Sequence, residues 1–268
     1  MPLKISGEAF GEDITLDAAV FFNWSAGQER YTASVEGRSK GREWSLRAAS
    51  PSAMKSNGKK TMGTVTLPGD FEIAPGHRVR EWNSLTLNEA ESGTAEWNKA
   101  LAIFDARIRS RFIEPAQILI NSENGKGRGT NGFAVLAIDF LLIETIEGFR
   151  RGLTSHRTHS KALFKAFLTG WPAFISCVPA GKSADDLAVN VFEQGRCALH
   201  HTGSTDRIVV RKSGPVFVFH DDGRIEINRS RLHRELTKAF DSYLADLHAP
   251  PSTDLRKKFI TKMNHICS

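Results

Sequence analysis

Cysteine is scarce in this chain, and long apolar runs are absent. The three cysteines, Cys177, Cys197 and Cys267, are an odd number without paired spacing, which argues against a disulfide framework and against a cysteine zinc site. No stretch approaches the roughly 18 consecutive apolar residues of a membrane span. The first ten residues also lack a basic segment followed by an apolar run. We therefore expect a cytoplasmic protein with reduced cysteines and no membrane partner.

Several enzyme motifs are missing as well. The glycine-rich segment 124–132 lacks the spacing of a Walker loop, and no serine lies in a nucleophile elbow. His156 and His159 have no carboxylate at a convincing distance for a metal site. We expect neither a metal nor a cofactor. Lys126 and Arg128 of the glycine-rich segment remain candidates for contacts with an RNA backbone.

Positive charge is concentrated in the later part of the chain. The whole sequence has 36 Lys and Arg against 30 Asp and Glu, whereas residues 1–90 have 11 of each. The entire net charge of +6 therefore lies beyond residue 90. Such an excess attracts polyanions such as nucleic acid, but it is equally consistent with an ordinary solvated surface.

The hydrophobic period changes near residue 90. Before it, short β-branched and aromatic runs alternate with period two, which predicts strands; they cover residues 31–36, 43–47, 61–67 and 77–82. After it, apolar residues recur at helical spacing; the predicted helices are 96–113, 133–149, 185–201, 230–247 and 253–266. Pro115 is expected to end the first helix at Glu114.

These patterns predict an α+β chain in two parts. Residues 1–88 would form a small antiparallel β module, and residues 89–268 an antiparallel helical bundle. Short strands around Asp222-Gly223 and 212–215 predict a two- or three-stranded meander inserted at about 207–228. The few polar residues of 133–149 place that helix in the core. Glu144 within it must bond an arginine or the backbone of a neighbouring helix, or face a functional site.

The hexapeptide Arg196-Cys197-Ala198-Leu199-His200-His201 is the best candidate for chemistry. It places a permanent cation beside imidazoles that titrate near neutral pH. On a regular helix, Glu193, Arg196 and His200 lie within about 60° of one another, whereas His201 lies about 140° from Arg196, nearer Asn190. A regular helix therefore favours His200 as the partner of Arg196, and an unwound end would admit His201. The alternative interpretation is a charged solvent face with a salt bridge between Glu193 and Arg196.

Arg196, four intervening residues and His201 resemble the Arg-x4–6-His signature of the HEPN superfamily, helical-bundle proteins that include toxin and antiphage ribonucleases. The surroundings are similar too: an apolar helix at 143–150, Phe-Glu-Gln before the arginine, Thr-Gly-Ser-Thr after the histidine, and a closing helical segment at 243–266. The resemblance covers roughly residues 94–266 and does not include the β module. Cys197 departs from the pattern, because the residue after the arginine is often polar in catalytic members.

The resemblance implies a metal-independent endoribonuclease, with RNA as substrate and a homodimer in which two motifs share one cleft. Arg196 would polarise the scissile phosphate, and His201 would exchange a proton with the 2′-hydroxyl or the 5′-oxygen. His200 would assist or replace His201, while Glu193, Asn190 and Glu144 would support the site. The alternative is an inactive RNA-binding, nucleotide-binding or dimerisation scaffold. In either case, the β module is a candidate for recognising a protein partner or trigger.

Overall fold

The computed structural model describes residues 3–9, 12–24, 31–39, 42–49, 67–123, 130–155, 158–203, 205 and 207–268. For the first four ranges and for residues 201–202, this description covers the backbone. The chain divides into two compact units, Met1–Gly63 and Thr64–Ser268, and each is described by itself.

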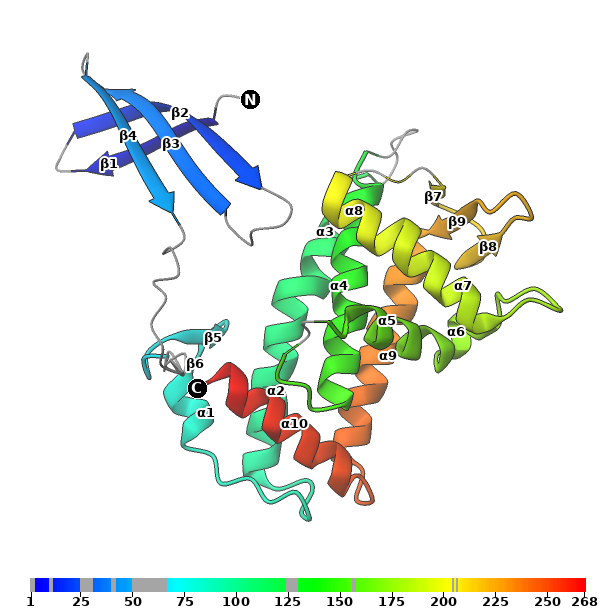
Figure 1. Ribbon diagram of the computed structural model, residues 1–268. Coiled ribbons are helices and arrows are strands. Elements are labelled where there is room, and N and C mark those ends of the chain that lie inside the picture. Colours follow the sequence, from blue (N-terminus) through cyan, green and yellow to red (C-terminus); the bar gives the residue numbers. More distant parts are fainter. Residues whose placement is uncertain are drawn as a thin grey trace, which may run out of the picture. The chain divides into compact units, whose positions relative to one another are not determined.

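The first unit contains a four-stranded antiparallel sheet whose strands follow one another in sequence order (Figure 1). The strands are β1 (Leu3–Ala9), β2 (Glu12–Trp24), β3 (Tyr31–Ser39) and β4 (Arg42–Ala49). Val35 of β3 pairs with Val20 on one side and Leu46 on the other. The strands predicted at 31–36 and 43–47 are confirmed, whereas most of the strand predicted at 61–67 lies outside the described residues.

Residues 72–83 form a short hairpin followed by a helix. The elements are β5 (Glu72–Ala74), β6 (His77–Arg78) and α1 (Val79–Asn83). The strand predicted over 77–82 is therefore wrong beyond Arg78. The Glu81 carboxylate accepts a hydrogen bond from the Arg78 backbone N–H and so caps the helix, which lets Val79 and Trp82 enter the core of the second unit together. The division between the compact units falls before these elements.

The second unit is mainly helical. Its longer elements are α2 (Ala95–Ile108), α3 (Glu114–Asn121), α4 (Gly132–Arg150), α5 (Ser160–Thr169), α7 (Ala184–Val191), α9 (Arg229–His248) and α10 (Thr253–Ile266). The short helix α6 spans Pro172–Ile175. Helix α4 packs against α3, α5, α9 and α10, which confirms the prediction of a core helix at 133–149. Phe104, at the centre of an aromatic cluster, contacts Phe149, Phe240 and Phe259. Among the helices in the described ranges, none has the length and apolar composition needed to cross a membrane.

The helix that contains Pro115 does not end at Glu114, so that prediction is wrong. A π-helical turn, η1 (Arg109–Ile113), joins α2 to α3, and Pro115 lies in the first turn of α3. The backbone N–H of Glu114 donates to the carbonyl of Arg109, five residues earlier. The irregular turn precedes a residue that has no N–H to donate, so the helix continues through the proline.

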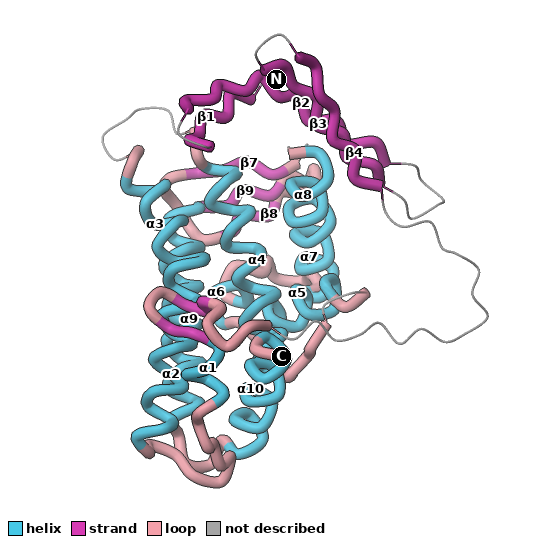
Figure 2. The backbone as a smooth tube through the Cα atoms, turned by 90° about the vertical axis from the view of Figure 1, so that its left-hand side faces the viewer, coloured by secondary structure: helices cyan, strands magenta, loops and turns pink. Residues whose placement is uncertain are grey.

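A small sheet follows the α7 helix. It contains β7 (Ile208–Arg211), β8 (Phe217–Phe219) and β9 (Ile225–Asn228), in the order β7-β9-β8. Because β7 runs parallel to β9, the sheet is not the predicted meander, although the predicted insertion at 207–228 does contain it. Gly132, the first residue of α4, lies against Val210. Figure 2 shows the sheet beside this end of α4.

Candidate functional site

The candidate hexapeptide lies in one continuous but irregular helix. Helix α7 begins after Ser183, whose side chain accepts a hydrogen bond from the backbone N–H of Asp186. It continues through a π-helical segment, η2 (Phe192–Cys197), into α8 (Ala198–Thr202). Gly203 ends the helix in the left-handed conformation, with φ of 68°. His200 and His201 are therefore both helical, and Arg196 lies within the irregular segment.

Gly195 allows η2 to approach its neighbours closely. A Cβ atom added at this position would lie 2.9 Å from Phe140 of α4 and 3.0 Å from Ile208 of β7. Any side chain would force these apolar neighbours apart. The glycine therefore permits the contact that places Arg196 over α4. Single-turn π segments inside α-helices are frequent at functional sites.

Arg196 is held by the buried carboxylate of Glu144. Its Nε donates to Glu144 Oε1 at 2.5 Å, and its Nη2 lies 3.4 Å from Oε2. The Glu144 side chain is 4% exposed and that of Arg196 is 17% exposed. The guanidinium also lies over the ring of Phe192, 5.8 Å from its centroid. Of the partners predicted for Glu144, the structure shows the arginine of a neighbouring helix, and that arginine is the candidate site residue.

A small cavity of about 180 Å³ adjoins this pair. Arg196 and His200 line it together with four apolar residues, Ala137, Phe140, Leu141 and Leu199. The cavity therefore has an apolar wall from α4 and a cationic edge from the irregular helix. The structure brings Arg196 and His200 together, whereas the side chain of His201 lies outside the described residues. Ala137 and Leu141 of this wall were not predicted as site residues, because their apolar spacing indicated only a core helix.

Glu193 does not pair with Arg196. It forms an ion pair with Lys161 of α5, with Glu193 Oε1 and Lys161 Nζ 2.7 Å apart, and both side chains are largely exposed. The prediction that Glu193 lies beside Arg196 assumed a rotation of 100° per residue. The wider π-helical turn between the two residues departs from that value. The role of orienting Arg196 passes from Glu193 to Glu144.

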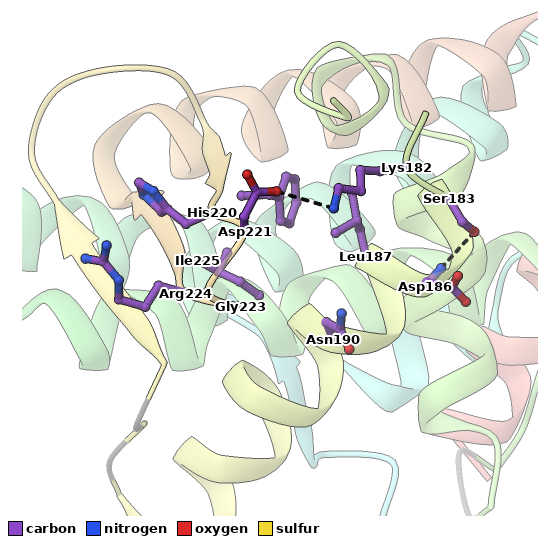
Figure 3. A pocket seen from close by; sticks show the side chains of 11 residues that line it. Lys182, Ser183, Asp186, Leu187, Asn190, His220, Asp221, Gly223, Arg224 and Ile225 are labelled. Carbon is purple, nitrogen blue, oxygen red and sulfur yellow. Dashed lines mark hydrogen bonds and ion pairs between the residues drawn. The ribbon is translucent and has the colours of Figure 1, made fainter. Parts of the chain in front are cut away.

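Asn190 faces a different cavity. It projects from α7 into a space of about 240 Å³ between this helix and the turn that connects β8 to β9 (Figure 3). Lys182 and Asp221 form an ion pair at 3.4 Å in the same cavity. Asn190 does not line the Arg196 cavity. Asn190 and the pair of Arg196 and His200 therefore line different cavities.

The remaining candidates are Cys197, which the structure describes, and two basic residues of the glycine-rich segment. Burial raises the pKa of the Cys197 thiol above its ordinary value, although the charge of Arg196 acts in the opposite direction. The thiol is therefore protonated near neutral pH. Lys126 and Arg128 lie outside the described residues. Within the described ranges, groups of three or more His, Cys, Asp or Glu that could hold a metal ion do not occur.

Comparisons with protein-family models, with curated proteins and with solved structures find no match to this chain.

Proposed function

We propose that the chain is a metal-independent endoribonuclease of HEPN type, with its site at the Arg196 cavity. The observation that carries the proposal is the convergence of Arg196 and His200 on one cavity, with Arg196 fixed by Glu144. A guanidinium has five N–H donors in a rigid fork. Glu144 engages two of its three nitrogens, so donors remain for a phosphate.

In the proposed reaction, a neutral imidazole of His200 or His201 accepts the proton of the 2′-hydroxyl. The 2′-oxygen then forms a bond to phosphorus, and the bond from phosphorus to the 5′-oxygen breaks. The departing 5′-oxygen takes a proton from a second, protonated imidazole. Arg196 stabilises the negative charge that develops on the non-bridging oxygens. The products are a 2′,3′-cyclic phosphate and a 5′-hydroxyl.

Three exposed apolar side chains on α3 and α4 support the homodimer that belongs to this proposal. Ile118 of α3 and Phe133 and Leu141 of α4 are 66%, 38% and 45% exposed. Leu141 also lines the Arg196 cavity. Exposed large apolar side chains beside a functional cavity are typical of an interaction surface. A second copy that covers Leu141 would lie beside the cavity.

The test is cleavage of single-stranded RNA by the purified full chain in EDTA. We compare the wild type with Arg196→Lys, His200→Ala and His201→Ala. The control is His265→Ala, which removes an exposed histidine of α10. Arg196→Lys keeps the positive charge beside Glu144 but loses the planar fork. We expect cleavage to fall about 100-fold or more in Arg196→Lys and in at least one of the two site-histidine variants. Loss of activity in EDTA, or equal activity in all variants, contradicts the mechanism.

A second candidate function is an inactive scaffold that binds RNA or a nucleotide through the same cavity. The protonated thiol of Cys197 beside Arg196 favours it, because this position is often polar in catalytic members of the superfamily. This alternative is selected if the chain binds RNA, if Arg196→Lys weakens that binding, and if no cleavage occurs with divalent ions or with EDTA.

A further inference from the structure

The segment from 207 to 238 is the basic part of the second unit. It contains eight Lys and Arg against four Asp and Glu. The rest of the second unit within the described ranges has 16 Lys and Arg against 18 Asp and Glu. The segment comprises the small sheet and the first half of α9. The excess of positive charge beyond residue 90 is therefore concentrated on these elements.

Most of this charge is at the surface. Seven of the eight basic residues are exposed, whereas only two of the four acidic residues are. The exposed basic residues are Arg207, Arg211, Lys212, Arg224, Arg231, Arg234 and Lys238, and we call them the basic face. Five of the seven have a carboxylate partner within 4.0 Å: Arg211 and Glu226, Lys212 and Glu123, Arg224 and Asp222, and Arg234 and Lys238 with Glu235. Within the described residues, no carboxylate lies at ion-pair distance from Arg207 or Arg231.

The beginning of α9 adds to this charge. Acidic side chains normally occupy the first turn of a helix, where they favour the positive end of the helix dipole. The first turn of α9 has no acidic residue and contains Arg229 and Arg231 instead. Arg229 is buried and contacts Glu123 through Nη2. Its Nε and Nη1 have no hydrogen-bond partner. This helix end thus carries an excess of cations, and of its two arginines only Arg231 is exposed to a bound anion.

The sheet that carries part of the basic face packs against the helical segment that carries Arg196. Ile208 at the start of β7 is in contact range of Gly195, the residue before Arg196. Figure 2 shows β7, β9 and β8 beside α8, the helix that carries His200. Arg207 directly precedes β7, and its guanidinium lies so close to Gly223 that a Cβ there would be 2.6 Å from Nη1. The sheet and the Arg196 segment are thus neighbours in the second unit.

We propose that the basic face binds the phosphodiester backbone of single-stranded RNA and holds it beside the Arg196 cavity. The choice of RNA rests on the proposed function, whereas the binding surface rests on the charge of the face. Arginine and lysine side chains hold nucleic-acid phosphates with little regard to sequence. The binding is therefore strongly salt-dependent and nearly independent of sequence.

The experiment measures binding of a 2′-O-methyl single-stranded RNA, which cannot be cleaved through its 2′-hydroxyl, at several KCl concentrations. The test variant combines Arg207→Gln, Arg231→Gln and Arg234→Gln. The control variant combines Arg80→Gln, Lys99→Gln and Lys257→Gln, which are exposed basic residues outside the face. Both variants lower the net charge by the same amount, so they separate position from total charge. None of the six side chains is in a buried ion pair.

The logarithm of the association constant falls linearly with the logarithm of the salt concentration, and each phosphate contact on a single strand contributes about 0.7 to the steepness of that line. The test variant removes three such contacts, so we expect its line to be less steep by about 2. At low salt, the dissociation constant should rise about tenfold or more, whereas the control variant should stay close to the wild type. Equal weakening in both triple variants, or salt-independent binding by the wild type, overturns the proposal. If the wild type binds RNA but does not cleave ordinary RNA, the proposed ribonuclease activity is wrong, whereas the proposed basic face stands. If the wild type cleaves RNA but the test variant binds it as tightly as the wild type, the proposed basic face is wrong, whereas the proposed ribonuclease activity stands.

Discussion

Helix α4 carries two buried carboxylates with different surroundings. Asp139 accepts a hydrogen bond at 2.8 Å from Nδ1 of His233 on α9, and both side chains are almost completely sealed, at 0% and 3% exposed. Glu144 bonds Arg196 on η2, and that arginine is 17% exposed and lines a cavity. Burial raises the pKa of Asp139 to about 6, with the hydrogen bond from His233 acting against it. Each acid thus fixes a basic side chain of another helix.

The difference between the pairs lies in the basic partner. His233 is almost completely buried and lines no described cavity, so its pair with Asp139 joins α4 to α9. Arg196 reaches a cavity, so its pair with Glu144 can present a cation to a ligand. A buried ion pair is weak evidence of stabilisation by itself. The exposure of the basic side chain to a cavity therefore distinguishes a candidate site from a purely structural pair.

The largest expected effect is on the sealed pair. Asp139→Ala removes the partner of a buried histidine, and we expect the free energy of unfolding to fall by about 3–5 kcal/mol. RNA cleavage per folded molecule should stay within about twofold, because a change in a sealed pair leaves the transition-state contacts intact. Urea unfolding and single-turnover cleavage measure the two quantities. The double variant Asp139→Leu/His233→Leu should recover part of the lost stability. A cleavage defect larger than twofold in folded Asp139→Ala would remove the distinction between the pairs.

Glu144→Gln should produce the opposite pattern. Glutamine keeps an acceptor for Arg196 but loses the charge and the second carboxylate oxygen, so the guanidinium is less well fixed. We expect cleavage per folded molecule to fall about tenfold to 100-fold, mainly in kcat, with a smaller loss of stability than in Asp139→Ala. Glu147→Gln is the matched control, because Glu147 is buried on the same helix but pairs with Arg151. Equal cleavage by the two glutamine variants would show that Glu144 does not position Arg196.

The sequence predicted the regular helices well. The expected helix at 230–247 is observed at Arg229–His248, and the one at 253–266 at Thr253–Ile266. Both have clear period-3.6 patterns, and Pro250 and Pro251 separate them. The need of Glu144 for a partner also followed from elementary energetics, because a buried carboxylate is costly unless it is paired, and an arginine of a neighbouring helix was one of the expected partners. These features depend on local pattern or on a strong burial cost.

Irregular geometry could not be predicted in the same way. Regular periodicity placed Glu193 beside Arg196, but η2 contains a wider turn, and Glu193 pairs with Lys161 instead. The turn accompanies the close approach of Gly195 to Phe140 and Ile208, which are distant in sequence. The strand predicted at 77–82 failed for a similar reason, because long-range packing of Val79 and Trp82 outweighed local alternation.

The smallest effect concerns the helix that carries Arg196. Ser183 caps α7 by accepting a hydrogen bond at 3.2 Å from the backbone N–H of Asp186, and Ser183→Ala should lower the free energy of unfolding by about 1 kcal/mol. Ser183→Thr keeps a capping oxygen and is the matched control. Urea unfolding and cleavage are measured together. If Glu144 fixes Arg196, cleavage per folded molecule stays unchanged in Ser183→Ala, because the cap lies far along the helix from the ion pair. A cleavage loss as large as that of Glu144→Gln would mean that the whole helix, and not the buried carboxylate, sets the position of Arg196.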